Sequence, residues 1–205
     1  MRLIGMLDSP YVRRTAISLR RLGVAFELEQ LSVFSEPERF SAINPLLKVP
    51  TLVCDDATVL VDSSLIILHV ERLTASHSLT PLAPGDALRD LRITGLALAA
   101  CEKAVQRIYE QRLRPEEKRH APWVERIDMQ LAVAWRELEQ ELAIASPPLD
   151  AERATHGAIA LAVAWRFCSA MLPEWTAGIE APRLRAFSAA AERLDDFRAF
   201  DFDLP

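Results

Sequence analysis

Cysteine is scarce in this chain, with three residues among 205 that lie far apart in the sequence. No two of them stand in a C-x-x-C pair, so we expect neither a disulfide framework nor a cysteine-based zinc site. The four histidines are scattered as well, without the H-x-x-x-H spacing that places two metal ligands on one helix face. We therefore expect no metal.

Long hydrophobic runs are also missing. No stretch approaches the roughly 20 apolar residues needed to span a bilayer, and the opening "MRLIGMLDSP" lacks the pattern of a secretory signal. We therefore expect a cytoplasmic protein without a membrane partner. With 24 Lys and Arg against 29 Asp and Glu, the net charge of −5 gives no general attraction to nucleic acid. A composition that is 50% hydrophobic and 26% charged is typical of a globular chain with one or two domains.

Up to about residue 80, strand patterns alternate with helix patterns. Ser9 followed by Pro10 is typical of a helix start, and Gly23 of a helix stop. The predicted elements are a strand at 2–7, a helix at 10–22, a strand at 24–31, a short helical or irregular stretch at 35–43, a hairpin of strands at 49–54 and 58–62, and a helix at 65–73. A sheet built in this order contains parallel and antiparallel pairs, as in a mixed four-stranded thioredoxin-like domain.

The second part of the chain has long helical periodicity and few strand formers. Leucine, alanine and valine recur at three- and four-residue steps over residues 87–113, 122–145 and 151–171. The Pro- and Gly-containing segment "SHSLTPLAPGD" separates the two patterns. We predict a thioredoxin-like domain at 1–78 and an all-α helical bundle domain at 86–205.

Three motifs carry a resemblance to a known family. They are "SPYVRR" at 9–14, "NPLLKVPTLV" at 44–53 and "DSSLIILHVE" at 62–71, and a weaker fourth is "RLRPEEKRHAPWVERI" at 112–127. In order and spacing they resemble the bacterial members of the cytosolic glutathione transferases. The resemblance spans both predicted domains, and it implies an enzyme that uses glutathione as co-substrate.

The resemblance implies that Ser9 is the catalytic residue, whose hydroxyl stabilises the glutathione thiolate. Taken alone, a Ser before a Pro is more often only a helix cap. Tyr11 is a rival hydroxyl donor or a packing aromatic. A disulfide-exchanging relative would read Cys-Pro-Tyr-Cys, whereas Ser9 and Val12 occupy both sulfur positions here. A thiol-disulfide oxidoreductase is therefore less expected than a glutathione transferase or a non-catalytic binding protein of the same fold.

The γ-glutamyl end of glutathione is assigned by the same resemblance to the start of the third predicted helix. Its carboxylate suits the backbone N–H groups and hydroxyls of Ser63 and Ser64, and its ammonium suits Asp62. Without the resemblance, these three residues are a routine helix start.

The rest of the tripeptide is assigned to the segment before the third predicted strand. A cis peptide bond between Val49 and Pro50 is implied, and the backbone of Val49 would pair with the cysteinyl amides. Lys48 would meet the glycine carboxylate, or it is a solvated surface lysine. An X-Pro bond without this context is usually trans.

The second substrate, a small electrophile, is not identified by the sequence. Residues expected to line its pocket are Leu7, Asp8, Tyr11, Val105 and Tyr109, although an apolar helix stripe is more often core.

The chain departs from the family pattern in two places. Cys101 stands where relatives often carry an Asp, and we expect Cys101 and Cys168 to be buried. The sixth helix of the family commonly opens with a Ser or Thr and an Asp three residues later, whereas here Thr155 is followed by Ala158. This weakens the expected capping box and leaves the helix dependent on packing around Trp165.

Two classes of function follow. The first is a glutathione transferase that adds glutathione to an electrophile, as in detoxification, or uses it in a reduction. The alternative is a non-catalytic binding or regulatory protein that retains the fold. The resemblance also implies a homodimer, with helices at 63–73 and 87–113 available to face a partner.

Overall fold

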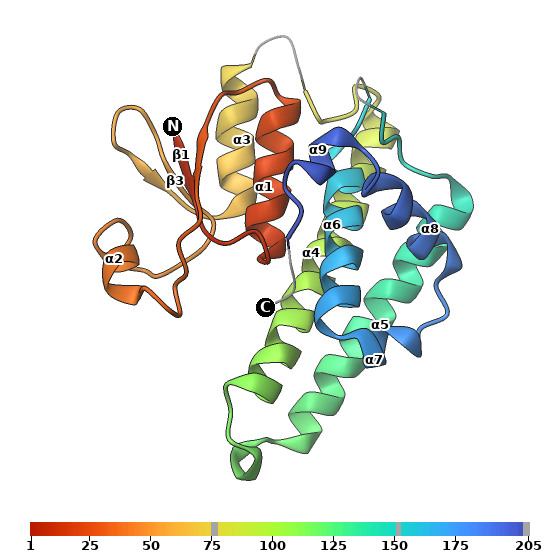
Figure 1. Ribbon diagram of the computed structural model, residues 1–205. Helices are drawn as coiled ribbons and strands as arrows, with labels where there is room; N and C mark the ends of the chain where they lie inside the picture. Colours follow the sequence, from red (N-terminus) through yellow and green to blue (C-terminus); the bar gives the residue numbers. More distant parts are fainter. Residues whose placement is uncertain (75–77, 151–152, 203–205) are drawn as a thin grey trace. The chain divides into compact units, whose positions relative to one another are not determined.

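The protein is described by a computed structural model that covers residues 1–74, 78–150 and 153–202. The chain divides into two compact units, one of Met1–Leu79 with Leu194–Pro205 and the other of Thr80–Arg193. We call them the N-terminal unit and the helical unit. Figure 1 shows the first in red to yellow together with the last part of the blue C-terminal segment.

The N-terminal unit has these elements in chain order: β1 (Arg2–Ile4), α1 (Pro10–Arg21), β2 (Glu27–Glu29), α2 (Pro37–Ser41), β3 (Thr51–Val53), β4 (Val59–Leu60), α3 (Ser63–Leu73) and, near the end of the chain, α9 (Asp195–Arg198). The strands form one sheet in the order β2-β1-β3-β4. β1 is parallel to β2 and antiparallel to β3, and β3 is antiparallel to β4. The predicted mixed sheet is confirmed.

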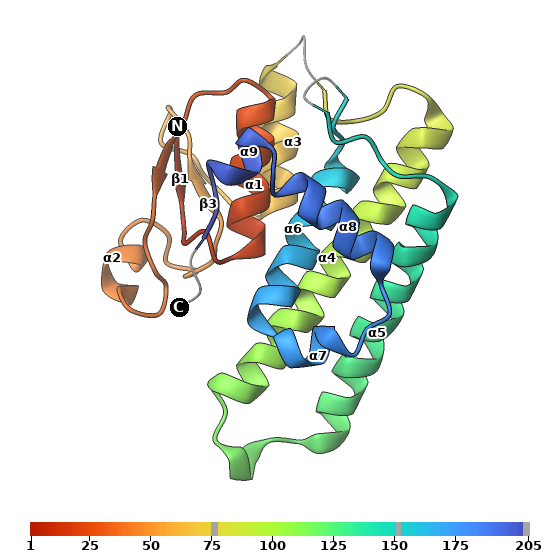
Figure 2. The same ribbon diagram turned by 45° about the vertical axis from the view of Figure 1, so that its right-hand side comes forward.

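Helices cover the two faces of this sheet differently. α1 and α3 pack side by side along one face (Figures 1 and 2). On the other face, Phe40 of α2 packs with Ile4 of β1 and with Leu31. Successive side chains of a strand point to opposite faces, so Leu3 points toward α1 and α3. Because Leu3 and Ile4 are both fully buried, core lies on each side of β1.

Local signals set the bounds of α1. Ser9 is its N-cap in an extended conformation, and Pro10 is its first helical residue. After the C-cap Leu22, Gly23 adopts φ +71°, a conformation that costs glycine little. These predicted signals are confirmed.

The first two strands are shorter than predicted. The patterns at 2–7 and 24–31 yield only Arg2–Ile4 and Glu27–Glu29 as strands. Gly5 ends β1 because its φ of +140° lies outside strand geometry, and the chain then turns into α1. Hydrophobic residues continue beyond both strands without sheet pairing, so the hydrophobic pattern overstated their length.

The helical unit contains α4 (Pro84–Arg112), a 3₁₀ turn (Glu116–Lys118), α5 (Ala121–Ile144), α6 (His156–Met171), α7 (Pro173–Ala177) and α8 (Pro182–Ala191). α4 packs against both α5 and α6. Trp135 of α5 meets Trp165 of α6 edge to face, with ring centroids 5.0 Å apart. The predicted all-α part and the packing around Trp165 are confirmed.

The start of α6 differs from the prediction in position and in capping. The helix begins at His156 rather than 151, because Thr155 is its extended N-cap, and residues 151 and 152 lie outside the described residues. Thr155 Oγ1 accepts a hydrogen bond from Ala158 N at 3.2 Å. Asp90 of α4 accepts a second one from Gly157 N at 2.9 Å. Ala158 leaves the capping box incomplete, as expected, because no side chain at that position can accept from Thr155 N. The carboxylate of Asp90 instead satisfies a further N–H group of the first turn, a contact that the sequence did not indicate.

The end of the chain requires a correction to the predicted domain at 86–205. Residues from 194 onward group with the N-terminal unit rather than with the helices before them. The buried guanidinium of Arg13 on α1 accounts for this, since it donates to the backbone carbonyls of Phe197 and Phe200. This contact between distant segments has no local signal in the sequence.

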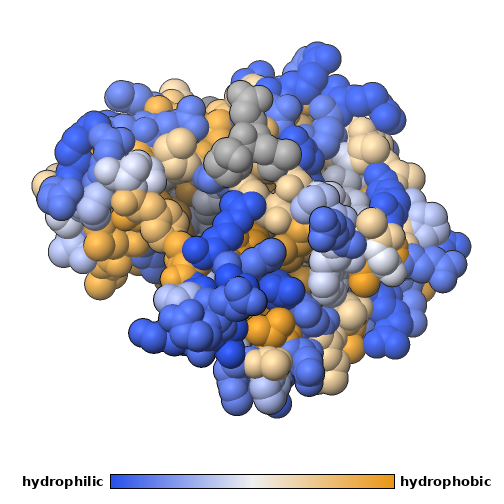
Figure 3. Space-filling model, turned by 60° about the horizontal axis from the view of Figure 1, so that its bottom comes forward, coloured by the Kyte–Doolittle hydropathy of each residue, from blue (hydrophilic) through white to orange (hydrophobic). Residues whose placement is uncertain are grey.

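The face drawn in Figure 3 is largely hydrophilic, and hydrophobic residues form separate areas on it. Phe34, Leu46 and Leu82 are 63%, 70% and 99% exposed. Scattered residues of this kind are normal and do not by themselves mark an interface. Within the described residues, no helix is both long enough and apolar enough to cross a membrane.

Candidate functional site

The first part of the site is the turn between β1 and α1. Ser9 is half-buried, and its Oγ accepts from Val12 N at 3.5 Å. This distance is at the outer limit for a hydrogen bond, so the capping interaction is weak. Accepting this bond uses only an oxygen lone pair, so the O–H of Ser9 can still donate to a further group. Tyr11 is half-buried in the first turn of α1.

Gly5 brings this turn close to the segment before β3. A Cβ at Gly5 would lie 2.6 Å from Val12 Cγ2 and 3.0 Å from Val49 Cγ1. Only glycine fits such an approach, and φ +140° also favours it there. The "SPYV" turn and Val49, which are separated in sequence, are thus adjacent in space. Gly5 was not singled out from the sequence.

The second part of the site is the loop that carries Lys48 and Val49. The Val49–Pro50 peptide bond is cis, as the resemblance implied. Asn44 is buried, and its Nδ2 donates to Thr51 Oγ1 at 2.8 Å. Thr51 Oγ1 donates in turn to the carbonyl oxygen of Lys48 at 2.7 Å. Asn44 and Thr51 therefore hold the loop, a role the sequence analysis missed, whereas the side chain of Lys48 is exposed.

The third part of the site is the start of α3. Asp62 is its N-cap, and one carboxylate oxygen accepts from Ser64 N at 2.9 Å and from Leu65 N at 3.3 Å. The backbone N–H of Ser64 is therefore engaged by Asp62. This differs from the expectation that it would face a ligand carboxylate. Asp62 itself is exposed, and Ser63 is buried.

Arg14 of α1 joins the first and third parts. Its Nη1 donates to Ser63 Oγ at 3.0 Å and to Ser64 Oγ at 3.2 Å. The arginine is only 4% exposed. Sequence reasoning missed it because "RR" at 13–14 looks like a solvated basic pair, and nearly all of α1 is buried, so periodicity does not distinguish it.

A carboxyl group borders Ser9. Burial raises the pKa of Asp8 above its ordinary value, and hydrogen bonds from the backbone N–H groups of Ser9 and Asp8 partly offset this. In its ionised form Asp8 disfavours a second negative charge close by. The turn therefore contains one group that favours a bound anion, Ser9, and one that opposes it.

The residues predicted to line a second pocket belong to both units. Leu7 is buried and Tyr11 half-buried in the N-terminal unit, while Val105 and Tyr109 lie on α4. Their common pocket stays a prediction. Cys101 and Cys168 are buried, as predicted. Among the described residues, no group of His, Cys, Asp and Glu is arranged to hold a metal ion.

Comparisons with known proteins agree with this architecture. Residues 3–78 match the family model described as "Glutathione S-transferase, N-terminal domain". A solved glutathione S-transferase of Methylobacterium radiotolerans, in complex with glutathione sulfonate, is 27% identical with a TM-score of 0.85, covering 100% of this chain and 94% of that one. A glutathione transferase family member of Pseudomonas fluorescens, with bound S-(propanoic acid)-glutathione, is 26% identical with a TM-score of 0.80 and 98% coverage of both chains.

A curated relative matches in part. The uncharacterized GST-like protein YibF of Escherichia coli is 30% identical over 111 residues, which are 54% of this chain and 55% of that protein. The match thus spans about half of that relative. A thioredoxin-like sheet unit followed by an all-α unit defines the class of fold found here. Residues 3–78 thus match the glutathione S-transferase N-terminal domain, and the chain as a whole is similar in structure to solved glutathione transferases.

Proposed function

We propose that the chain binds glutathione and makes its thiol the nucleophile that attacks a small electrophile, or that acts in a glutathione-dependent reduction. The observation that carries the proposal is the weakly engaged hydroxyl of Ser9, set in a turn that Gly5 brings against Val49. The solved relatives that contain glutathione sulfonate or a glutathione conjugate support the choice of ligand.

The chemistry requires a stabilised thiolate. A free thiol with a pKa of about 8.5 is only a few per cent ionised at pH 7, and the thiolate is the nucleophile. Lowering that pKa by two would require about 2.7 kcal/mol of preferential interaction with the anion. A hydrogen bond from Ser9 supplies part of this, and the amino end of α1 adds to it.

The ends of the tripeptide have partners in the same unit. The second carboxylate oxygen of Asp62 suits the γ-glutamyl ammonium, and the hydroxyls of Ser63 and Ser64 suit the γ-glutamyl carboxylate. The backbone of Val49 suits the cysteinyl amides, and Lys48 the glycine carboxylate.

Calorimetric titration with reduced glutathione, followed by a conjugation assay over several electrophiles, tests the proposal. S-methylglutathione is the matched ligand without a free thiol. Binding with turnover supports a transferase. Binding without turnover would identify the alternative, a non-catalytic glutathione-binding protein, and absence of binding would overturn both.

Two further parts of the proposal, association into a homodimer and a role in detoxification, rest on the family resemblance. A third, a cytoplasmic location, rests on the sequence pattern. The first can be checked by light scattering at micromolar protein, where a monomer mass would count against it.

A further inference from the structure

Arg14 places a buried positive charge behind the start of α3. Arg14 and Ser63 are only 4% and 3% exposed. Arginine remains ionised at every physiological pH, and a buried charge is costly unless other groups solvate it. The hydroxyl oxygens of Ser63 and Ser64 do so here, at 3.0 and 3.2 Å from Nη1.

This contact sets the direction of both hydroxyl groups. A serine oxygen that accepts from a guanidinium must direct its own proton elsewhere. Two O–H donors are therefore held on the side away from Arg14. Since hydrogen bonds in a chain polarise one another, a cation behind the oxygens makes these donors stronger.

Two backbone donors at the same helix start are already engaged. Asp62 accepts from the N–H groups of Ser64 and Leu65. An anion bound to this end of α3 would therefore depend on the two hydroxyl protons more than on those amides. The arrangement favours a ligand that accepts hydrogen bonds and carries negative charge.

We propose that Arg14 is a positioning residue that makes this end of the site selective for a carboxylate, acting through Ser63 and Ser64 without touching the ligand. The inference rests on the proposed function, since it concerns recognition of the α-carboxylate of the γ-glutamyl residue. It adds a residue to the site and a reason for its selectivity.

The test compares two ligands by calorimetry. One is reduced glutathione. The other is 4-aminobutanoyl-Cys-Gly, which keeps the ammonium and the thiol and lacks only the α-carboxylate. We expect the wild-type protein to prefer glutathione by roughly 10- to 100-fold. In Arg14→Gln, which keeps a donor and removes the charge, this preference is expected to fall about tenfold or more, through weaker binding of glutathione only.

Arg20→Gln is the matched control. Arg20 is on the same helix, pairs with Asp196 and has a side chain 47% exposed, so its loss should leave the ligand preference unchanged. Arg14→Lys keeps the charge on a side chain one atom shorter, and it should show an intermediate preference. If Arg14→Gln does not fold, Ser63→Ala tests the same path, and a wild-type preference in that variant would overturn the proposal.

Other outcomes separate the two claims. Equal weakening of both ligands in Arg14→Gln would indicate a merely structural role and overturn this inference. Equal affinity of the wild-type protein for both ligands would do the same, while leaving the proposed function intact. No binding of glutathione by the wild-type protein would instead overturn the proposed function.

Discussion

Arg13 Nε donates a hydrogen bond of 2.8 Å to the carbonyl oxygen of Phe200, which is 187 residues away in the sequence. Nη2 of the same arginine donates to the carbonyl of Phe197 at 3.1 Å, and the guanidinium carbon lies 5.8 Å from the Phe197 ring centroid. The neighbouring Arg14 points to α3 instead. One dipeptide on α1 thus anchors the end of the chain and supports the candidate site.

Replacing Arg13 tests the first of these roles. Arg13→Met removes both hydrogen bonds and the contact with the Phe197 ring, and keeps a long side chain. We expect a loss of about 2–3 kcal/mol in the free energy of unfolding, with faster hydrogen exchange in α9. Denaturant unfolding and exchange mass spectrometry measure these effects. Unchanged exchange in α9 would show that Arg13 does not hold this segment.

Asp62→Asn separates capping from ligand binding. Asparagine caps a helix as well as aspartate, so the melting temperature should hardly change. Loss of the charge should weaken binding of glutathione by roughly tenfold, because its ammonium loses an anionic partner. Glutaryl-Cys-Gly, which lacks that ammonium, should bind both proteins alike. A comparable loss with this analogue would remove Asp62 as the ammonium partner.

Asp90→Ala tests the cap that α4 supplies to α6. The carboxylate accepts from Gly157 N and is buried, so its removal leaves an N–H without its acceptor. We expect a loss of about 1–3 kcal/mol in stability. Asp90→Asn, which keeps an acceptor, should lose less. Thermal unfolding in which both variants match the wild-type protein would contradict a capping role.

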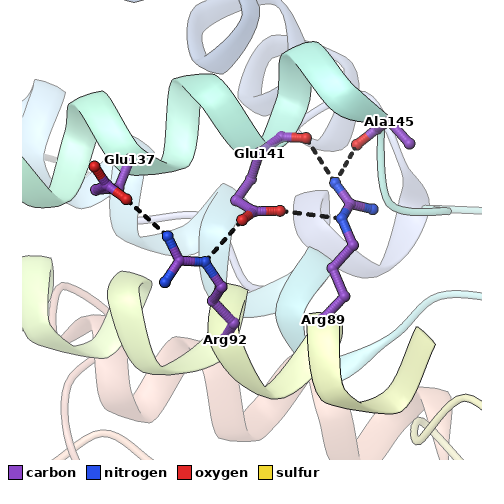
Figure 4. Close-up of polar contacts among 5 residues, drawn as sticks. All are labelled: Arg89, Arg92, Glu137, Glu141 and Ala145. Atoms are coloured by element: carbon purple, nitrogen blue, oxygen red, sulfur yellow. Dashed lines mark hydrogen bonds and ion pairs between the residues drawn. The ribbon is translucent and has the colours of Figure 1, made fainter. Parts of the chain in front are cut away.

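A cluster of ion pairs links α4 to α5. Glu141 accepts from Arg89 Nε at 3.0 Å and from Arg92 Nε at 2.8 Å, while Arg92 also donates to Glu137 at 2.7 Å (Figure 4). Arg89 reaches the carbonyls of Glu141 and Ala145 as well. The hydrogen bond from Arg92 is the main cause that holds the pKa of Glu141 below its ordinary value, against the effect of burial.

The lowered pKa of Glu141 determines how the stability of the fold changes with pH. A carboxyl that is more acidic in the folded state stabilises the fold above its unfolded pKa, about 4.3, and this stabilisation is lost as pH falls through the folded pKa. Glu141→Gln should therefore cost about 1–3 kcal/mol at pH 7, with the difference from wild type shrinking below about pH 4. Glu137→Gln is the control, expected to change stability by less than about 0.5 kcal/mol. A pH-independent cost for Glu141→Gln would contradict the ionic account.

Local features of the fold were accessible from the sequence. Ser9 and Pro10 start α1, and Gly23 follows its end, because caps and stops act within a few residues. The long helices of the second part were placed within three residues at the bounds of α4 and α5, because their periodicity is sustained.

Contacts between distant residues were not accessible in the same way. Arg14 meets Ser63 across 49 residues, and Asp90 meets Gly157 across 67. No spacing rule connects such pairs, since the fold alone brings them together. The sequence therefore predicted the site as separate motifs. Buried residues that hydrogen-bond to those motifs, such as Arg14 and Asn44, were found only in the structure.

The central claim is that Ser9 stabilises the thiolate of bound glutathione. Loss of a cap alone would lower stability by about 0.5–2 kcal/mol without moving a thiol pKa. Asp8→Asn should have the opposite effect to Ser9→Ala, because removal of the Asp8 charge should lower the pKa of a thiol bound nearby.

The most direct measurement is the ultraviolet absorbance of the bound thiolate as a function of pH, in wild type, Ser9→Ala and Asp8→Asn at saturating glutathione. The account predicts a pKa below that of free glutathione in the wild-type protein, and a rise of about 1–2 in Ser9→Ala. Superimposable curves for wild type and Ser9→Ala would contradict it and leave Ser9 as a helix cap.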